Sequence, residues 1–369
     1  MKARGNRSLW GTMRVPAAGA LAAGLVLLLL GAQPASAQRP PTDRHVRELG
    51  QYLSGVKIAE PIVYRQLAVY PLLVDDVPLL RGRWLTADAA ISGGALAVTE
   101  KGGGSVPLLR VENRSRDQYV FLMSGEVIAG GMQTRTVRHD VVLAPGQQID
   151  LEVFCVEAHR WSGEVKFSAG SKTMLPQSIQ GELRKGADQT KVWSEVTRNN
   201  RSLGTENATG NLDMALQAAP VQAKLEPLRR KIVPEIPRGT TGFIFIDRGR
   251  ALGAELFGSE SLARQLLPKL LDSYAVDYVL LGRPAAQDDG RIDNHAAIAM
   301  FERICLTGSH RATTPGSGSG IRTRPAGLLG DGVSLDDVLV HYGVQAGSTG
   351  APPPEPPPAI IYPRPAQRD

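Results

Sequence analysis

Cysteine is almost absent from this chain of 369 residues, which contains only Cys155 and Cys305. Two cysteines cannot form the framework of several disulfide bonds that holds many small secreted domains together. The two could pair across a long loop, and only their distance in the folded chain decides whether they do. The cysteines therefore predict no disulfide framework, and the length is ample for one large domain or two smaller ones.

Several motifs that identify common enzyme classes are also missing. The chain has no Gly-x-Ser-x-Gly nucleophile elbow and no phosphate-binding loop that ends in Gly-Lys-Ser or Gly-Lys-Thr. It has neither a His-Glu-x-x-His motif nor a Cys-x-x-Cys pair, and only six histidines. The glycine-rich run GGALAVTEKGGGS lies between predicted strands rather than at the start of a helix, so we do not expect it to bind phosphate. These patterns assign no cofactor and no metal ligand.

Acidic residues are absent from the first 37 positions, which have the three parts of a signal peptide. Four basic residues come first, residues 15–30 form an apolar run that ends in LVLLLL, and Ala-Ser-Ala at 35–37 offers a cleavage site. The apolar run is too short and wrongly flanked for a stable membrane span, although an uncleaved anchor is the alternative. No arginine pair marks the twin-arginine route, and no cysteine follows to accept a lipid. The sequence predicts a secreted or periplasmic chain, cleaved after Ala37.

Loss of this segment changes the charge of the chain. The segment holds four of the 42 basic residues and no acidic residue, so its removal lowers the net charge from +6 to +2. A nearly neutral chain gives no electrostatic reason to expect binding to nucleic acid. No later apolar run approaches the length of a membrane span, so we expect none after cleavage.

Short strand-like segments dominate the first half of the remaining chain. Each is bounded by glycine, aspartate, asparagine or serine, as is typical of strands. From residue 63 onward these segments are VYRQLAVYPLLV, ALAVTE, SVPLLRVEN, QYVFLM, VVLAPG and IDLEVFCVE. Strand chemistry resumes at residue 242 with GFIFI, a DRGR turn and ALGAELF, which predict a hairpin. GLLG and VLVHYG follow near the end.

Helical segments separate these two groups of strands. Residues 188–198 have helical spacing of their apolar residues and Asp188 as a cap. Residues 212–232 favour a helix that is interrupted at Pro220 and Pro227, and Ser259 can cap a further helix. The sequence thus predicts an α+β fold, with mainly antiparallel β-sheets and a few helices packed on them.

The same pattern predicts the organisation of the chain. A tether and a short helix at 38–62 follow the signal peptide at 1–37, and a single α+β domain follows at 63–346. An alternative is two β-rich halves that the helical 188–232 region joins. Residues 347–369 are rich in proline and should form an extended, disordered tail. Such a tail is a spacer or, alternatively, a docking site for a protein partner.

Side chains that are capable of chemistry are concentrated between residues 125 and 161. They are Glu126, Gln133, Arg135, His139, Cys155, Glu157, His159, Arg160 and Trp161. If residues 150–161 form one strand, the alternation of side chains places Cys155, Glu157, His159 and Trp161 on the same face. Each residue alone has an ordinary structural explanation, such as burial of Cys155 or pairing of Glu157 with an arginine. Their density is what favours a site.

We assign candidate roles by chemistry. Catalytic candidates are Glu126, Cys155 and Glu157, because a buried carboxylate can act as a general base and a cysteine as a nucleophile. Candidate ligand-binding residues are Gln133, Arg135, Arg160 and Trp161, in which the two arginines could clamp a phosphate or a carboxylate. Zinc binding by Cys155, Glu157 and the nearby histidines would lack a recognised spacing, so we assign no metal ligand. Equally, an arginine–glutamate network could simply fix the register of the strands.

Five separated motifs resemble a bacterial family named for its association with ADP-ribosylglycohydrolases and rhodanese-phosphatase proteins. They are SGEVIAGGMQTR, VVLAPG, CVEAHRW, KVWSEV and TGFIFIDRGRALGAELF, and the similarity covers about residues 63–343. The family's strand after the Pro-Gly turn reads Cys-Val-Glu, two residues, then Arg-Trp, which Cys155, Glu157, Arg160 and Trp161 match. Its upstream Gly-Glu and Gln-x-Arg match at Glu126, Gln133 and Arg135. The family has a glycine before Arg-Trp, and His159 departs from it.

Two functions follow from these residues and from the resemblance. The genes that occur near those of the family link it to ADP-ribose or nucleotide processing. The resemblance therefore implies an anionic small-molecule ligand for a polar or catalytic site at 125–161. The alternative is a non-catalytic periplasmic binding or interaction module, in which the same residues form a structural polar network. A structural β domain tied by a disulfide is a third option. The sequence does not decide whether the protein is an enzyme.

Overall fold

The computed structural model describes residues 44–101, 107–160, 167, 173–280, 294–324 and 327–346. The chain divides into two compact units, Met1–Arg39 and Pro40–Asp369, and every described residue belongs to the second. The described residues contain 8 α-helices and 17 strands in mainly antiparallel sheets, which confirms the predicted α+β class. None of these helices is both long enough and apolar enough to cross a membrane. The expected signal peptide and proline-rich tail lie outside the described residues.

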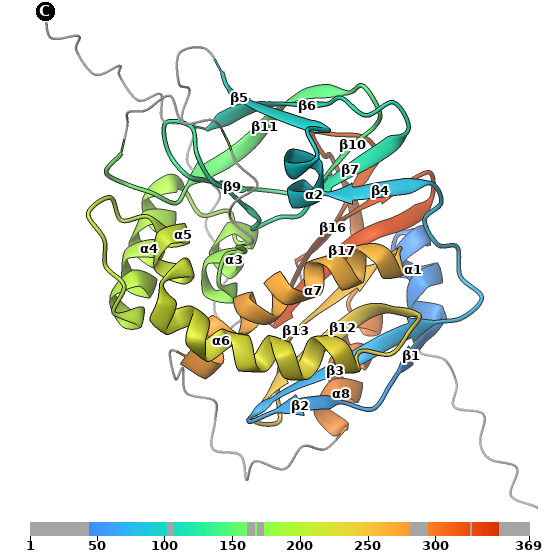
Figure 1. Cartoon of the computed structure of the whole chain (residues 1–369). Helices are drawn as coiled ribbons and strands as arrows, with labels where there is room; N and C mark the ends of the chain where they lie inside the picture. Colours follow the sequence, from blue (N-terminus) through green and yellow to red (C-terminus); the bar gives the residue numbers. More distant parts are fainter. Residues whose placement is uncertain are drawn as a thin grey trace, which may run out of the picture. The chain divides into compact units, whose positions relative to one another are not determined.

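A nine-stranded antiparallel sheet brings together the two ends of the described chain. Its strands are β1 (Val56–Ile58), β2 (Ile62–Tyr64), β3 (Leu67–Val74), β12 (Thr240–Asp247), β13 (Arg250–Phe257), β14 (His310–Ala312), β15 (Ser319–Thr323), β16 (Leu328–Leu335) and β17 (Val338–Ala346). Their order is β1-β3-β12-β13-β17-β16-β15-β14, and β2 also pairs with β3 (Figure 1). The predicted hairpin is β12–β13, in which Arg248 and Gly249 both have positive φ, as a tight hairpin turn requires.

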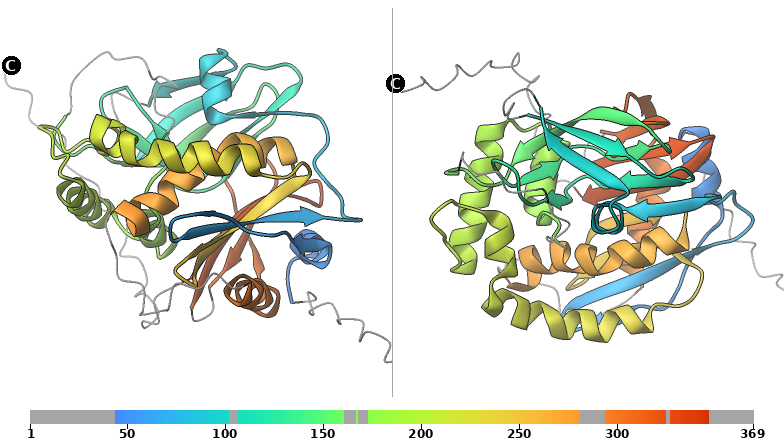
Figure 2. Two further views of the ribbon diagram at one scale, coloured as in Figure 1. Left: turned by 60° about the horizontal axis from the view of Figure 1, so that its bottom comes forward. Right: turned by 45° about the horizontal axis from the view of Figure 1, so that its top comes forward.

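Helices cover both faces of this sheet. The helices of the fold are α1 (Arg47–Ser54), α2 (Ala87–Ser92), α3 (Gln177–Arg184), α4 (Gln189–Leu203), α5 (Leu212–Gln217), α6 (Ala219–Ile232), α7 (Glu260–Ala275) and α8 (His295–Leu306). Helices α6 and α7 lie on one side of the sheet and α8 on the other (Figure 2). Burial on both faces explains why the middle of β12 is continuously apolar. Phe243 and Phe245 join the core under α7, whereas Ile244 and Ile246 join the core under α1 and α8.

Two smaller sheets pack around a third apolar core. The five-stranded sheet contains β5 (Leu96–Glu100), β6 (Leu108–Asn113), β11 (Gln148–Cys155), β9 (Arg135–Val137) and β8 (Val127–Ile128), in that order. The three-stranded sheet has the order β10 (Val141–Leu143), β7 (Gln118–Leu122) and β4 (Arg83–Thr86), and β4 is parallel to β7. Helix α2 contacts β4, β5 and β7 and so joins the two small sheets.

Several helix boundaries follow the sequence. The Asp188 side chain accepts a hydrogen bond from the Lys191 amide at the start of α4, as its cap position predicts. Helix α4 runs beyond the predicted end at residue 198 and ends at Gly204, which adopts the left-handed conformation. The interruption predicted at Pro220 occurs at Ala218, between α5 and α6, whereas the one predicted at Pro227 was wrong, because α6 continues through this residue.

A chain of buried charges crosses the interior between the large sheet and the turn that precedes β10. His341 of β17 lies between two carboxylates, with Nδ1 2.6 Å from Asp140 Oδ2 and Nε2 3.0 Å from Glu255 Oε2. Tyr274 of α7 donates a hydrogen bond to Glu255 Oε1 at 2.9 Å. Arg184 of α3 places Nη2 4.0 Å from the same oxygen. The five ionisable side chains of this network thus come from five separate segments.

These surroundings determine the charge of His341. Burial alone would lower the pKa of the imidazole, but Asp140 and Glu255 outweigh this effect and raise the pKa to about 9. The ring is therefore an imidazolium at neutral pH and balances the two carboxylates. Gly343, two residues along β17, makes room for the Glu255 carboxylate, because a Cβ there would lie 2.3 Å from Glu255 Oε2.

His341 should make the stability of the fold depend on pH. Its pKa rises from 6.5 in the unfolded chain to about 9 in the fold, so its contribution is complete below pH 6.5 and is lost as the pH rises through 9. We expect the free energy of unfolding to decrease by on the order of 3 kcal/mol over this interval. Urea denaturation at a series of pH values measures it. A His341→Gln variant should lose this slope, and His310→Gln, which changes an exposed histidine on β14, should keep it. Equal stability of the wild type at pH 6.5 and pH 9 would contradict the expectation.

Candidate functional site

Strand β11, which carries the first of the candidate residues near position 155, is shorter than the sequence predicts. The predicted strand 150–161 ends at Cys155, so the alternation of side chains does not extend to Glu157. Beyond this point the chain bonds to other segments: the Val156 amide donates to the Thr134 carbonyl, and the amides at 158 and 159 donate to the Thr209 carbonyl. The prediction that Cys155, Glu157 and His159 share one strand face was therefore wrong.

Glu157 is the centre of a buried polar network. Arg160 donates from Nε to Oε1 at 2.9 Å and from Nη2 to Oε2 at 2.8 Å. Thr134 donates to Oε2 from its amide at 3.0 Å and from its hydroxyl at 3.1 Å. The Gln133 side chain donates to the main-chain carbonyl of Glu157 at 2.9 Å, and Asn211 donates to the Thr134 hydroxyl at 3.0 Å. Both oxygens of the Glu157 carboxylate are thus occupied by donors from its own fold.

The two arginines continue this network toward β5. Arg135 is fully buried, and its Nη1 donates to Gln133 Oε1 at 3.4 Å while Nη2 lies 3.9 Å from Glu100 Oε2. Arg160 Nη1 donates to the Gly131 carbonyl at 2.8 Å. Gly131 has a φ of +59°, and a Cβ there would lie 2.5 Å from Glu100 Oε1. Both the turn and the close approach therefore require glycine at this position.

These surroundings determine the protonation states of the Glu157 carboxylate and the Cys155 thiol. Burial would raise the pKa of Glu157, but the hydrogen bonds from Arg160 and Thr134 outweigh it and lower the pKa to about 2. Burial raises the pKa of the Cys155 thiol to about 11. At neutral pH the carboxylate is therefore ionised and the thiol protonated. Cys155 and Cys305 are both buried and free, so the disulfide between them that the sequence left open is not formed.

Cys155 has a second set of contacts, through its main chain. Its amide donates to Gln189 Oε1 and its carbonyl accepts from Gln189 Nε2, both at 2.8 Å. The amide side chain of Gln189, at the start of α4, therefore takes the place of a neighbouring strand. Such a contact satisfies the backbone at the end of β11 and ties α4 to it.

Glu126 lies in a separate network. Lys269 of α7 places Nζ 2.7 Å from Glu126 Oε1 and 2.5 Å from Asp88 Oδ2. The Met123 amide donates to Glu126 Oε2 at 2.7 Å. Burial would lower the pKa of Lys269, but the two carboxylates raise it above its ordinary value. Among the described residues, no hydrogen bond or ion pair joins the Glu126 side chain to the Glu157 side chain, so the segment holds two networks rather than one site.

The sequence did not identify all the members of these networks. Lys269 is the one charged residue in the otherwise apolar run LLPKLL of α7, which is a signal for a buried ion pair. Its partner Glu126 lies 143 residues away, so the pairing could not be inferred. No pattern in the sequence marked Thr134 or Asn211 as a member of the Glu157 network. Trp161, the remaining ligand-binding candidate, lies outside the described residues.

Two small pockets lie elsewhere among the described residues. One is between β14–β16 and the turn at His139, and the other is among α5, α6, α7 and Thr173. Each has an interior volume of about 10 Å³, enough for about one water molecule. Neither is lined by Glu126, Cys155 or Glu157. Among the described residues, no three histidine, cysteine or carboxylate side chains are arranged to hold a metal ion.

Glu126→Gln should strongly destabilise the fold, because it removes one of the two carboxylates that balance the buried Lys269. Breaking a buried ion pair costs about 3–5 kcal/mol, and urea denaturation measures the loss. Adding Lys269→Met should restore part of the stability, since it removes the uncompensated cation. The control is Glu235→Gln, which breaks an exposed pair with Lys231 and should cost less than about 1 kcal/mol. If Glu126→Gln were as stable as the wild type, the result would contradict a structural role for the pair.

Comparison with known proteins identifies a family. No curated protein and no solved structure matches the chain. Residues 55–344 match the ARG and Rhodanese-Phosphatase-superfamily-associated Protein domain, ARPP-1. The match extends from the start of the large sheet into its last paired strand, β17, and includes both polar networks. Because it covers more than half of the sequence, the chain belongs to the ARPP-1 family.

Proposed function

We propose that this chain is a non-catalytic binding or interaction module that acts outside the cytoplasm, and that the polar residues of its 125–160 segment stabilise the fold. The observation that carries the proposal is the engagement of both Glu157 oxygens by Arg160 and Thr134. A general base works best with a pKa near the operating pH and must reach the proton it removes. Glu157, with a pKa of about 2 and four donors on its carboxylate, is poorly suited to this role.

The other catalytic candidates support the same proposal. The thiolate is the reactive form of a cysteine, and the Cys155 thiol, with a pKa of about 11, is protonated at neutral pH. Burial raises the pKa of Glu126, as a general base would require, but its carboxylate is already bound by Lys269 and the Met123 amide. In each case a residue type that enzymes use for chemistry is held by contacts that a fold needs for stability. The pairing and burial of these side chains are therefore better explained by a structural role than by catalysis.

Export from the cytoplasm is the second part of the proposal, and the basic, apolar and small-residue regions of 1–37 support it. We expect the full chain, expressed in a bacterium, to appear in the periplasm or the medium with Gln38 as its first residue. N-terminal sequencing of that fraction checks this. Leu28→Arg, which places a charge in the apolar run, should block export, whereas Leu28→Val should not. Wild-type protein retained uncleaved in the cytoplasm would count against it.

Glu157→Gln tests the structural role directly. The change removes the charge that pairs with Arg160 and several charge-assisted hydrogen bonds, so we expect a loss of about 2–4 kcal/mol in the free energy of unfolding. Below pH 4.5 the wild type should also lose stability as Glu157 takes up a proton, down through its pKa of about 2, and the variant should lack this component. Urea denaturation at pH 7 and pH 3 measures both effects.

The matched control is Glu182→Gln, because Glu182 and Lys185 have the same i,i+3 spacing in a partly exposed pair on α3. It should cost less than about 1 kcal/mol. Both variants are then screened for thermal stabilisation by nucleotides and sugar phosphates. A ligand that stabilises the wild type should still stabilise Glu157→Gln. The opposite result, normal stability with loss of the ligand effect, would make Glu157 a functional residue and overturn the proposal.

A further inference from the structure

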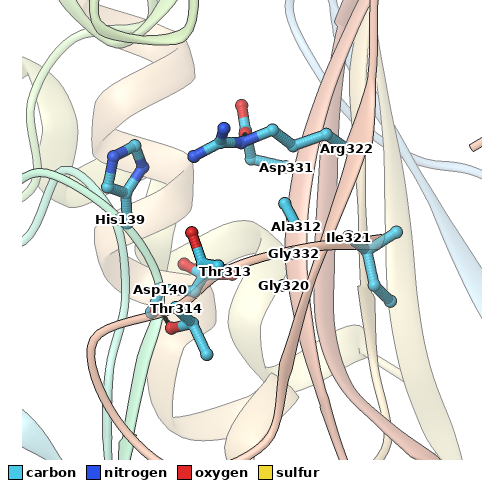
Figure 3. Close-up of a pocket in the computed structure, with 10 residues that line it drawn as sticks. All are labelled: His139, Asp140, Ala312, Thr313, Thr314, Gly320, Ile321, Arg322, Asp331 and Gly332. Carbon is cyan, nitrogen blue, oxygen red and sulfur yellow. Dashed lines mark hydrogen bonds and ion pairs between the residues drawn. The ribbon is translucent and has the colours of Figure 1, made fainter. Parts of the chain in front are cut away.

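The pocket beside β15 and β16 has the features of an anion site (Figure 3). His139, in the turn between β9 and β10, and Arg322 of β15 face each other across it, and Thr313 lies at its edge. Two glycines, Gly320 and Gly332, line it without contributing side chains. Three polar side chains from separate segments thus surround one small open space.

The donors in this pocket are only partly used. Arg322 Nε lies 3.5 Å from Asp331 Oδ1, and Arg324 Nη2 donates to both oxygens of the same carboxylate, at 2.8 and 3.0 Å. Within the part of the chain that the structure describes, no hydrogen bond engages Arg322 Nη1, Arg322 Nη2 or the His139 ring. The two arginines therefore neutralise the Asp331 carboxylate, and the Nη1 and Nη2 groups of Arg322 still have N–H donors available for a ligand.

Asp140, the other acid that lines the pocket, is also neutralised. Its Oδ1 accepts a hydrogen bond from the Ser124 amide at 2.8 Å, and its Oδ2 pairs with the His341 imidazolium. Thr314 donates to the Asp140 carbonyl at 3.0 Å, which fixes the turn. Neither carboxylate that borders the space therefore presents an uncompensated negative charge to it.

We infer that this pocket binds the terminal oxyanion of a phosphate-type or sulfate-type group, through Arg322, His139 and the Thr313 hydroxyl. The interior volume of about 10 Å³ admits one oxygen atom, and the rest of the ligand would remain in the open mouth. Arginine favours such groups because its planar fork donates two parallel hydrogen bonds. The inference deepens the proposed function, since it names the ligand class of a binding module.

Binding should depend on pH through His139. Burial lowers the pKa of this imidazole, Arg138 and Arg322 lower it further, and Asp331 and Glu152 oppose them. The ring is therefore mainly neutral at pH 7. A bound anion would favour the imidazolium, so binding takes up a proton and strengthens as the pH falls. Sulfate is a suitable probe because its own charge does not change between pH 5.5 and pH 7.5.

The experiment titrates the full chain with sodium sulfate, with sodium chloride at equal ionic strength as the reference. Nuclear magnetic resonance of labelled histidine rings follows His139, one of six in the chain. We expect a saturable shift of the His139 signal with sulfate only, and tighter binding at pH 5.5 than at pH 7.5. Arg322→Gln should weaken sulfate binding by about tenfold or more, since it removes a charge-assisted donor. The control Arg201→Gln removes an equal, exposed charge on α4 and should have no effect.

His139→Gln, measured by calorimetry, is the second variant and covers the case in which Arg322→Gln does not fold. It should weaken binding at pH 5.5 and abolish the pH dependence, whereas His159→Gln, which changes an exposed histidine beyond the end of β11, should not. Equal shifts with chloride and sulfate, or unchanged affinity in the folded variants, would overturn the inference. That failure is separate from a failure of the proposed function, because the latter is judged by the stability and ligand response of Glu157→Gln.

Discussion

The imidazolium of His341 between Asp140 and Glu255 is the interaction on which the arrangement of the layers depends. Removing charges from water costs several kcal/mol for each ion, so a buried charge persists only where a partner and further hydrogen bonds compensate it. Here the partners come from β13, β17 and the turn before β10, and Arg184 and Tyr274 add contacts from α3 and α7. These contacts can therefore all form only when the large sheet, the helices and that turn are packed together. Hydrophobic contacts would tolerate a small slip between these layers, but paired charges would not.

The same rule explains the segment 125–160, whose chemical side chains first suggested an active site. Glu157 is paired with Arg160, and Glu126 with Lys269, and backbone amides complete each carboxylate. These contacts join strands of the small sheets to each other and to α7. Glutamate and arginine beside the ends of these strands thus indicate burial before they indicate chemistry. The motifs that carry the family resemblance include Glu126, Glu157 and Arg160, so the resemblance is as consistent with a shared fold as with a shared reaction.

Local structure could be predicted from this sequence, whereas the pairing of distant residues could not. The cap at Asp188 and the β12–β13 turn depend on a few adjacent residues, and both were predicted correctly. The end of β11 was missed because the chain after Cys155 bonds to residues near 209, which no local pattern reveals. Asp140 and His341 lie 201 residues apart, and only the topology of the sheets brings them together. The described candidate residues take part in buried polar contacts, but their division into two networks could not be inferred from the sequence.

The pairing of charges distinguishes the proposed ligand pocket from the networks around Glu157, Glu126 and His341. Buried charges whose hydrogen bonds are satisfied resist exchange with a ligand, because a ligand would have to replace contacts that already hold the fold. The His139 and Arg322 side chains differ, because they border a solvent-accessible space and keep donors in reserve. Asp140 connects the two situations: its carboxylate belongs to the His341 network, and its turn forms one wall of the pocket. The buried charges therefore hold one wall of the pocket in place before any ligand arrives, so little ordering cost remains for binding.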